Sequence, residues 1–125
     1  MKLKLLAAVL LVAPATASAQ SMNAQKFYQR AVALQNKGAL AIFSTDEIKA
    51  LMDEAQAAGR RARAIRVAAV NSGLAPRFCP PEQPLSIDEK DFMNRLSAIP
   101  AADRARINMT EAMTRILAGK YPCRT

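Results

Sequence analysis

The fold of this chain is decided by residues 44–72, which read STDEIKALMDEAQAAGRRARAIRVAAVNS. Apolar side chains recur in this stretch every three or four positions, which places them along one face of an α-helix. The stripe consists of Ile48, Leu51, Met52, Ala55, Ala58, Ala62, Ile65 and Ala69. Ser44 and Glu47 have the spacing of an N-terminal capping box, and Gly73 follows the stripe. We therefore expect one long helix over residues 44–72, either kinked at Gly59 or approached there by another backbone.

A first helix is expected before this one, over residues 22–37. Its apolar face is formed by Phe27, Ala31 and Leu34. Either Ser21 or Asn23 can cap its N-terminus, and Gly38 stands where a helix C-terminus favours a left-handed residue. The apolar connector over residues 39–43 is expected to pack against the core.

Two shorter helices are expected after a proline-rich loop over residues 73–84. Proline removes a backbone donor and opposes helix, so this loop separates the helices. Ser86 and Glu89 form a second capping box, which predicts a short third helix. The third helix would bury Phe92, Met93 and Leu96. Pro100 fits the first position of a fourth helix that runs to about residue 118, with Ile107 opposite its apolar face. The chain is thus expected to be an all-α bundle of about four helices.

The N-terminus decides the expected compartment. Lys2 and Lys4 precede an uninterrupted apolar run of nine residues over 5–13, and small residues follow it. Ala17-Ser18-Ala19 fits the small-x-small cleavage pattern, with Ala15-Thr16-Ala17 as a second choice. The alternative, a membrane anchor, needs about 20 apolar residues. We therefore expect a cleaved signal peptide over residues 1–19 and a single helical domain over residues 20–125, located in the periplasm without a stable membrane anchor.

The mature chain is basic. Without Lys2 and Lys4 the 18 Lys and Arg become 16, against 10 Asp and Glu, which leaves a net charge of +6. Such a surplus favours acidic partners, which include acidic proteins, anionic lipid headgroups and polyanions. A solvated basic surface without a partner is the plainer interpretation of the same charge. Nucleic acid is not an expected partner, because the N-terminal pattern predicts export and the basic stretch shows no interleaved aromatic residues.

Cys79 and Cys123 are the two cysteines of the chain. In an oxidising compartment two cysteines usually pair, so we expect a disulfide. It would close a loop of 45 residues, for which the chain-entropy model gives about 4 kcal/mol of stabilisation. That is a large share of the roughly 5–15 kcal/mol that holds a small domain together.

The lack of histidine limits the chemistry that the chain can perform. The sequence contains no His, which removes Ser-His and Cys-His catalysis and histidine-ligated zinc. Paired cysteines offer no thiolate, and no glycine-rich phosphate loop, CxxC or HExxH is present. Most carboxylates stand at expected helix starts, where they complement the helix dipole. We therefore expect a binding protein and not an enzyme, with no metal site and no cofactor.

Two groups of residues are candidates for contact with a partner. The first group is Arg60, Arg61, Arg63 and Arg66, which spread around the long helix. The second group is Arg77, Phe78 and Glu82, in a loop that prolines stiffen and Cys79 pins. A stiff loop can enter a cleft at a low cost in ordering entropy. The alternatives are a solvated helix surface and prolines that only delimit helices.

The C-terminal half of the chain resembles a known family. The pattern consists of Arg77-Phe78-Cys79-Pro80-Pro81, Ser86, Phe92-Met93-Asn94-Arg95-Leu96, Ile99-Pro100, Glu111-Ala112 and Tyr121-Pro122-Cys123. Over residues 73–123 it is similar to the Rap/Tai family, the periplasmic immunity proteins of type VI secretion systems. The resemblance implies an all-α periplasmic protein with a Cys79–Cys123 disulfide. It also implies binding to a secreted peptidoglycan amidase whose active site is occluded, often by a homodimer. Only the two cysteines carry over residue by residue, and residues 27–70 depart from the family pattern.

Three functions therefore remain as hypotheses. The first is an immunity-type inhibitor, which predicts a neighbouring gene for a secreted amidase. The second is a small periplasmic chaperone or stress protein, which predicts suppression of client aggregation on acidification. The third is another envelope interaction protein, which predicts association with membrane or peptidoglycan that weakens as salt screens the attraction.

Overall fold

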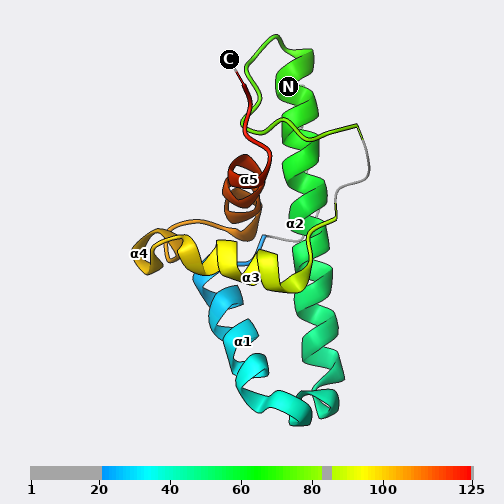
Figure 1. The fold of residues 1–125 in the computed structure, drawn as a ribbon, viewed down its shortest axis with the longest axis vertical. Helices are drawn as coiled ribbons and strands as arrows, with labels where there is room; N and C mark the ends of the chain where they lie inside the picture. Colours follow the sequence, from blue (N-terminus) through cyan, green and yellow to red (C-terminus); the bar gives the residue numbers. More distant parts are fainter. Residues whose placement is uncertain (1–20, 83–85, 125) are drawn as a thin grey trace, which may run out of the picture.

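The computed structural model describes residues 21–82 and 86–124, which form an all-α fold (Figure 1). The elements are α1 (Ala24–Lys37), the 3₁₀-helix η1 (Gly38–Phe43), α2 (Thr45–Asn71), α3 (Glu89–Ala98), α4 (Ala101–Arg104) and α5 (Met109–Lys120). The described ranges contain no β-strand, and one isolated bridge joins Asn23 to Asn108. The expected all-α class is confirmed, with five α-helices where four were expected. The expected signal peptide lies outside the described residues.

Helix α2 is the longest element, and it continues through Gly59 without a break. A Cβ atom at Gly59 would meet no other atom within 4 Å, so the expected close approach of another backbone is wrong. With 27 residues at a rise of 1.5 Å each, α2 is roughly 40 Å long. Because α5 has only 12 residues, it covers only part of the apolar stripe of α2. Met52 and Ile65, expected in the core, are consequently exposed.

Neither expected capping box forms as the sequence predicted. Ser44 precedes α2 but makes no side-chain cap, and its Oγ instead accepts a hydrogen bond from Lys37 Nζ at 2.8 Å. Glu47 pairs with Arg30 of α1 and does not turn back to the helix N-terminus. Asp88 caps α3 by accepting from the backbone N–H of Asp91, so this helix starts later than Ser86 predicted. Side chains from other elements thus override the local motif at α2.

The expected fourth helix is two helices, separated by residues 105–108. Asn108 caps α5 by accepting from the N–H of Glu111. The N–H of Ala24 donates to the carbonyl of Ile107 at 2.9 Å, and the N–H of Met109 donates to the carbonyl of Met22 at 2.7 Å. The start of α1 therefore lies against the break and satisfies its backbone groups. Ile107, which had no place in a continuous helix, packs against the core.

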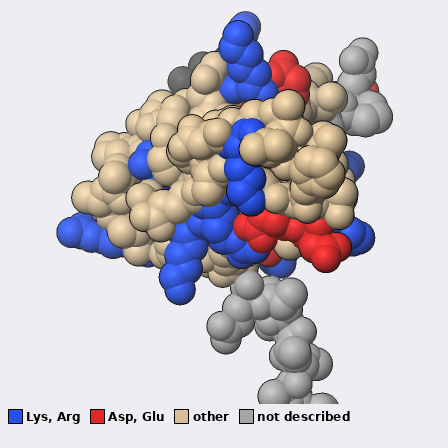
Figure 2. All heavy atoms as spheres, turned by 90° about the horizontal axis from the view of Figure 1, so that it is seen from below, with Lys and Arg blue, Asp and Glu red and all other residues tan. Residues whose placement is uncertain are grey.

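The 3₁₀-helix η1 at the turn between α1 and α2 lies on the surface. Its side chains were expected to pack against the core, but Leu40, Ile42 and Phe43 are exposed, Phe43 by 80%. Figure 2 views the molecule from this end, where uncharged residues make up most of the surface and Asp and Glu gather to one side. The turn is therefore an apolar projection and contributes little to the core.

The core lies where α5 packs on α2, with α1 and α3 against it and Phe78 inserted from the loop. Its buried apolar residues are Ala24, Phe27, Leu51, Ala58, Ala62, Phe78, Met93, Leu96, Ile99, Met109, Ala112, Met113, Ile116 and Leu117. In Figure 1 the upper end of α2 extends beyond α5, and the loop after α2 and the C-terminal tail run beside it. No helix within residues 21–82 or 86–124 combines the length and apolarity that crossing a membrane requires.

Candidate partner-binding surface

A disulfide joins the loop after α2 to the C-terminal tail. Cys79 and Cys123 are bonded with an S–S distance of 2.06 Å and a Cα–Cα distance of 4.9 Å, which confirms the expected pair. The N–H of Cys79 also donates to the carbonyl of Tyr121 at 2.8 Å. Two separate connections therefore hold this part of the loop against the end of α5.

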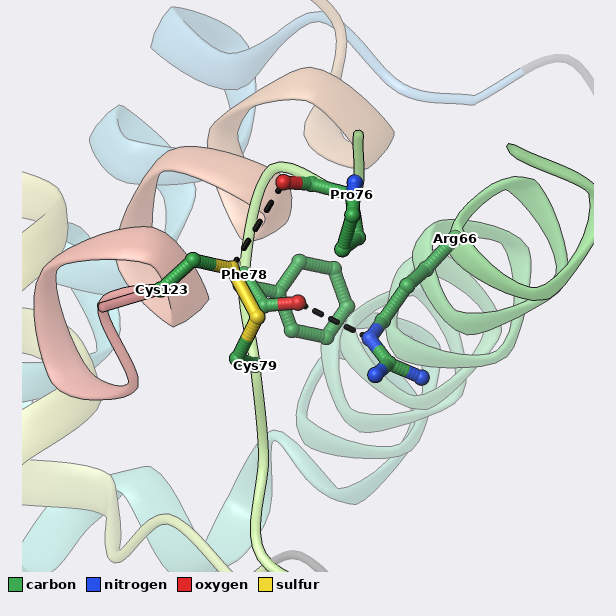
Figure 3. Close-up of a disulfide and its surroundings, with 5 residues drawn as sticks. All are labelled: Arg66, Pro76, Phe78, Cys79 and Cys123. Carbon is green, nitrogen blue, oxygen red and sulfur yellow. Dashed lines mark hydrogen bonds between the residues drawn. A yellow bond between two sulfur atoms is a disulfide. The ribbon is translucent and has the colours of Figure 1, made fainter. Parts of the chain in front are cut away.

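Phe78 fixes the same loop to α2. Its ring is only 1% exposed, and its carbonyl accepts a hydrogen bond from Arg66 Nε at 2.8 Å (Figure 3). The guanidinium carbon of Arg66 lies 5.8 Å from the centroid of the Phe78 ring, within the range of a cation–π contact. The Phe78 ring is thus a core residue that positions the loop.

The four arginines of α2 have different surroundings. Arg61 points inward and joins two helices, since its Nη2 lies 3.0 Å from Glu54 Oε1 and its Nε donates to Thr110 Oγ1 at 3.0 Å. Arg66 holds the loop, while its terminal nitrogens point away from the loop in Figure 3. Arg60 and Arg63 are exposed. The structure therefore does not gather the four arginines into one patch, which agrees with their expected spread around the helix.

Arg77 forms an ion pair with two hydrogen bonds to one carboxylate. Its Nη1 and Nη2 donate to the two carboxylate oxygens of Glu111 on α5 at 2.6 and 2.8 Å, and Arg115 Nε lies 3.3 Å from the same carboxylate. The hydrogen bonds from Arg77, followed by those from Arg115, hold the pKa of Glu111 below its usual range. Arg77 thus links the loop to α5. Glu82, the last candidate, is exposed at the end of the described part of the loop.

A groove of about 360 Å³ lies between α2, the loop and α5. Its lining is mainly apolar and consists of Ala62, Ile65, Arg66, Ala69, Leu74, Ala75, Arg77, Phe78, Asn108, Thr110, Glu111 and Thr114. Ala62, Phe78 and Thr114 are buried and form its floor, whereas Ile65 and Leu74 are 59% and 65% exposed. We call this site the α2–loop groove. It brings together Arg66, Arg77 and Phe78 of the expected candidates, but not Arg60, Arg61, Arg63 or Glu82.

Sequence reasoning missed the two apolar residues that matter most at this groove. Ile65 was assigned to the core stripe, and Leu74 was treated only as part of a loop. One signal was present in the sequence, because the apolar stripe expected over residues 44–72 is longer than the fourth helix expected from Pro100 to about residue 118. Exposed apolar residues that lie together are more informative than single ones.

A second cleft, of about 560 Å³, lies between α1 and α3. It is lined by Tyr28, Val32, Gln35, Asp88, Glu89, Lys90, Met93, Asn94 and Ser97, none of which was a candidate. Within residues 21–82 and 86–124, no group of Cys, Asp and Glu side chains is arranged to hold a metal ion. The α2–loop groove is therefore the site at which the expected candidates and the geometry meet.

Comparison with known proteins adds no relative to this description. No protein-family model matches the chain, and no curated protein or solved structure matches it significantly.

Proposed function

We propose that this protein is an exported inhibitor that acts in the periplasm, binds a peptidoglycan amidase delivered by a type VI secretion system and occludes the active site of that enzyme. The proposal starts from the resemblance of residues 73–123 to the Rap/Tai family. An inhibitor of this kind needs a stable surface and no catalytic group of its own.

The observation that carries the proposal is the rigid attachment of the loop beside an exposed groove. Residues 78 and 79 are held by the Arg66 hydrogen bond, the Cys79–Tyr121 hydrogen bond and the disulfide. A surface that is ordered before binding loses little conformational entropy in the complex. The disulfide also suits an oxidising compartment, where such bonds persist. These features favour a binding protein of the cell envelope.

The test uses the mature protein, residues 20–125, and the secreted amidase encoded nearest to its gene. We expect a stable complex in size-exclusion chromatography and loss of peptidoglycan hydrolysis at stoichiometric inhibitor. Lys49→Glu is a suitable control, because Lys49 is exposed on α2 away from the α2–loop groove and pairs with the exposed Asp53. This variant should inhibit like the unmodified protein. If none of the secreted hydrolases encoded nearby is bound or inhibited, the proposal is wrong.

A small chaperone is the second candidate, and the exposed apolar turn η1 favours it. Leu40, Ile42 and Phe43 would suit weak contacts with unfolded clients. An aggregation assay with reduced insulin at pH 7 and pH 4 tests this candidate, with Phe43→Ser as the matched variant. Suppression of light scattering that Phe43→Ser abolishes, together with no inhibition of any amidase, would favour the chaperone.

A further inference from the structure

The α2–loop groove is bordered by a stretch of chain without negative charge. Residues 55–81 contain five arginines and no Asp or Glu. Among the described residues, Glu111 is the only carboxylate that lines the groove, and it is already bound by Arg77 and Arg115. The electrostatic potential at the groove is therefore positive, which favours carboxylates on the partner and disfavours a basic partner.

The groove also offers apolar surface of limited extent. Ile65 and Leu74 are more than half exposed at its rim, and Ala62 and Phe78 close its floor. Its volume of about 360 Å³ is at the small end of binding cavities in proteins. A site of this size can take one or two apolar side chains, and central apolar anchors of this kind supply most of the affinity of many interfaces.

We propose that the α2–loop groove receives one large apolar side chain from an acidic segment of a protein partner, with flanking carboxylates bound by Arg66 and Arg63. The terminal nitrogens of Arg66 lie on the side of its guanidinium away from the Phe78 carbonyl (Figure 3), and the residue is partly exposed. Arg63 is exposed and lies three residues before Arg66, which places the two on neighbouring turns of α2. The planar fork of an arginine matches a carboxylate group in geometry as well as in charge. The inference rests on the proposed function only in that the partner is a protein.

The helix supplies matched controls for each contact. Val67 follows Ile65 by two residues, so the two side chains point about 160° apart around α2. Val67 is also apolar and exposed, but it does not line the groove. Arg60 is exposed like Arg63 but lies six residues before Arg66, about a third of a turn away from it. The substituted residues are all exposed: Arg60, Arg63, Ile65 and Val67. Their substitution should therefore leave the fold intact, which a far-UV spectrum and an unfolding curve would check.

The experiment selects ligands without assuming a natural partner. A library of random 12-residue peptides displayed on phage is panned on the mature protein, with counter-selection on Ile65→Asp. We expect the enriched peptides to carry one large apolar residue with Asp or Glu within four positions. Synthetic versions should lose roughly tenfold or more in affinity for Ile65→Asp and Leu74→Asp and a smaller factor for Arg63→Glu, because anchor residues dominate such contacts. Their affinity for Val67→Asp and Arg60→Glu should change by less than about twofold.

Several outcomes would overturn the inference. These are enrichment of basic peptides, no enrichment above background, or equal losses at the groove variants and their controls. The amidase assay is independent of this result. Inhibition that Ile65→Asp and Leu74→Asp leave unchanged would retain the proposed function and exclude the groove. Groove-dependent peptide binding without inhibition of any amidase would retain the groove as a binding site and contradict the proposed function.

Discussion

The guanidinium carbon of Arg104 lies 4.0 Å from the centroid of the Tyr28 ring, although Arg104 is only 6% exposed. Its Nε donates to Gln25 Oε1 at 2.7 Å, and its Nη1 donates to the carbonyls of Ser97 and Ile99 at the end of α3. The positive charge is therefore placed at the negative end of a helix dipole. One buried arginine thus joins α1, α3 and α4.

Replacement of Arg104 should destabilise the fold more than replacement of any exposed arginine. In Arg104→Met the carbonyls of Ser97 and Ile99 lose their donor, so we expect a loss of about 2–4 kcal/mol in the free energy of unfolding. Arg104→Lys should recover only part of the lost free energy of unfolding. An ammonium group lacks the planar fork that stacks on Tyr28 while it donates to several acceptors. Arg106→Met, at an exposed position, is the control and should change stability by less than about 0.5 kcal/mol. Urea unfolding measures the stability of all three variants. If Arg104→Met is as stable as the unmodified protein, the structural role of Arg104 is wrong.

Reduction of the disulfide should release the loop and the tail before it affects α2. The pair closes a loop with a sequence separation of 44, so we expect a loss of about 4 kcal/mol in the free energy of unfolding. Hydrogen exchange should accelerate first at the amide of Cys79, whose partner is the Tyr121 carbonyl. Amides of α2 that pack on α5 should stay protected.

Mass spectrometry of hydrogen exchange, with and without a phosphine reductant, measures this order. A Cys79→Ala/Cys123→Ala variant serves as the control, because its exchange should not respond to the reductant. A uniform increase in exchange along the whole chain would show that the disulfide holds the entire fold and not only one end of it.

The disulfide and the α2–loop groove show how much of the candidate site the sequence predicts. The pairing of Cys79 with Cys123 followed from composition and expected compartment, and the structure confirms it. The exposure of Ile65 and Leu74 did not follow, because apolar spacing shows which residues share a helix face but not how far a partner helix covers it. Burial of Phe78 and the inward turn of Arg61 likewise depend on contacts with α5 and α2 that are distant in sequence.

The helix boundaries were likewise predicted where neighbouring residues set them and missed where distant residues do. The end of α1 before Gly38 was predicted, and Asn23, one of the two expected caps, caps its start, since both ends are set by local capping. The break over residues 105–108 was missed because its carbonyl and amide groups are satisfied by Met22 and Ala24, more than 80 positions away. Local motifs therefore predicted the helix ends whose backbone groups are bound by neighbouring residues. They failed where hydrogen bonds from distant residues bind those groups instead.

Stability should fall in acid because bound cations lower the pKa of three carboxylates in the fold. Hydrogen bonds from Arg30, Lys120 and Arg77 lower the pKa of Glu47, Asp91 and Glu111, respectively. A carboxylate whose pKa is lower in the folded than in the unfolded state stabilises the fold above its unfolded pKa. That contribution is lost as the pH falls through the folded pKa. We therefore expect stability to be level above about pH 5 and to decline below about pH 4.

Urea unfolding between pH 7 and pH 3 measures this decline. Glu111→Gln should be less stable than the unmodified protein at pH 7, and its stability should fall less steeply in acid. An identical slope for the two proteins below pH 5 would mean that the Arg77–Glu111 pair contributes nothing to the acid response.

The two phenylalanines Phe27 and Phe43 should respond to truncation in opposite ways. Phe27 is buried in the core, and its ring lies edge-on to that of Phe92 with centroids 5.9 Å apart. Phe27→Ala should therefore cost about 3–5 kcal/mol, which combines lost burial with a cavity. Phe43→Ala at the exposed end of η1 should cost less than about 0.5 kcal/mol and should reduce self-association at high concentration, since an exposed apolar projection favours it. Urea unfolding and light scattering of the two variants measure both effects. If Phe43→Ala destabilises the fold as much as Phe27→Ala, the connector packs against the core as its sequence predicts, and the exposed position of η1 is wrong.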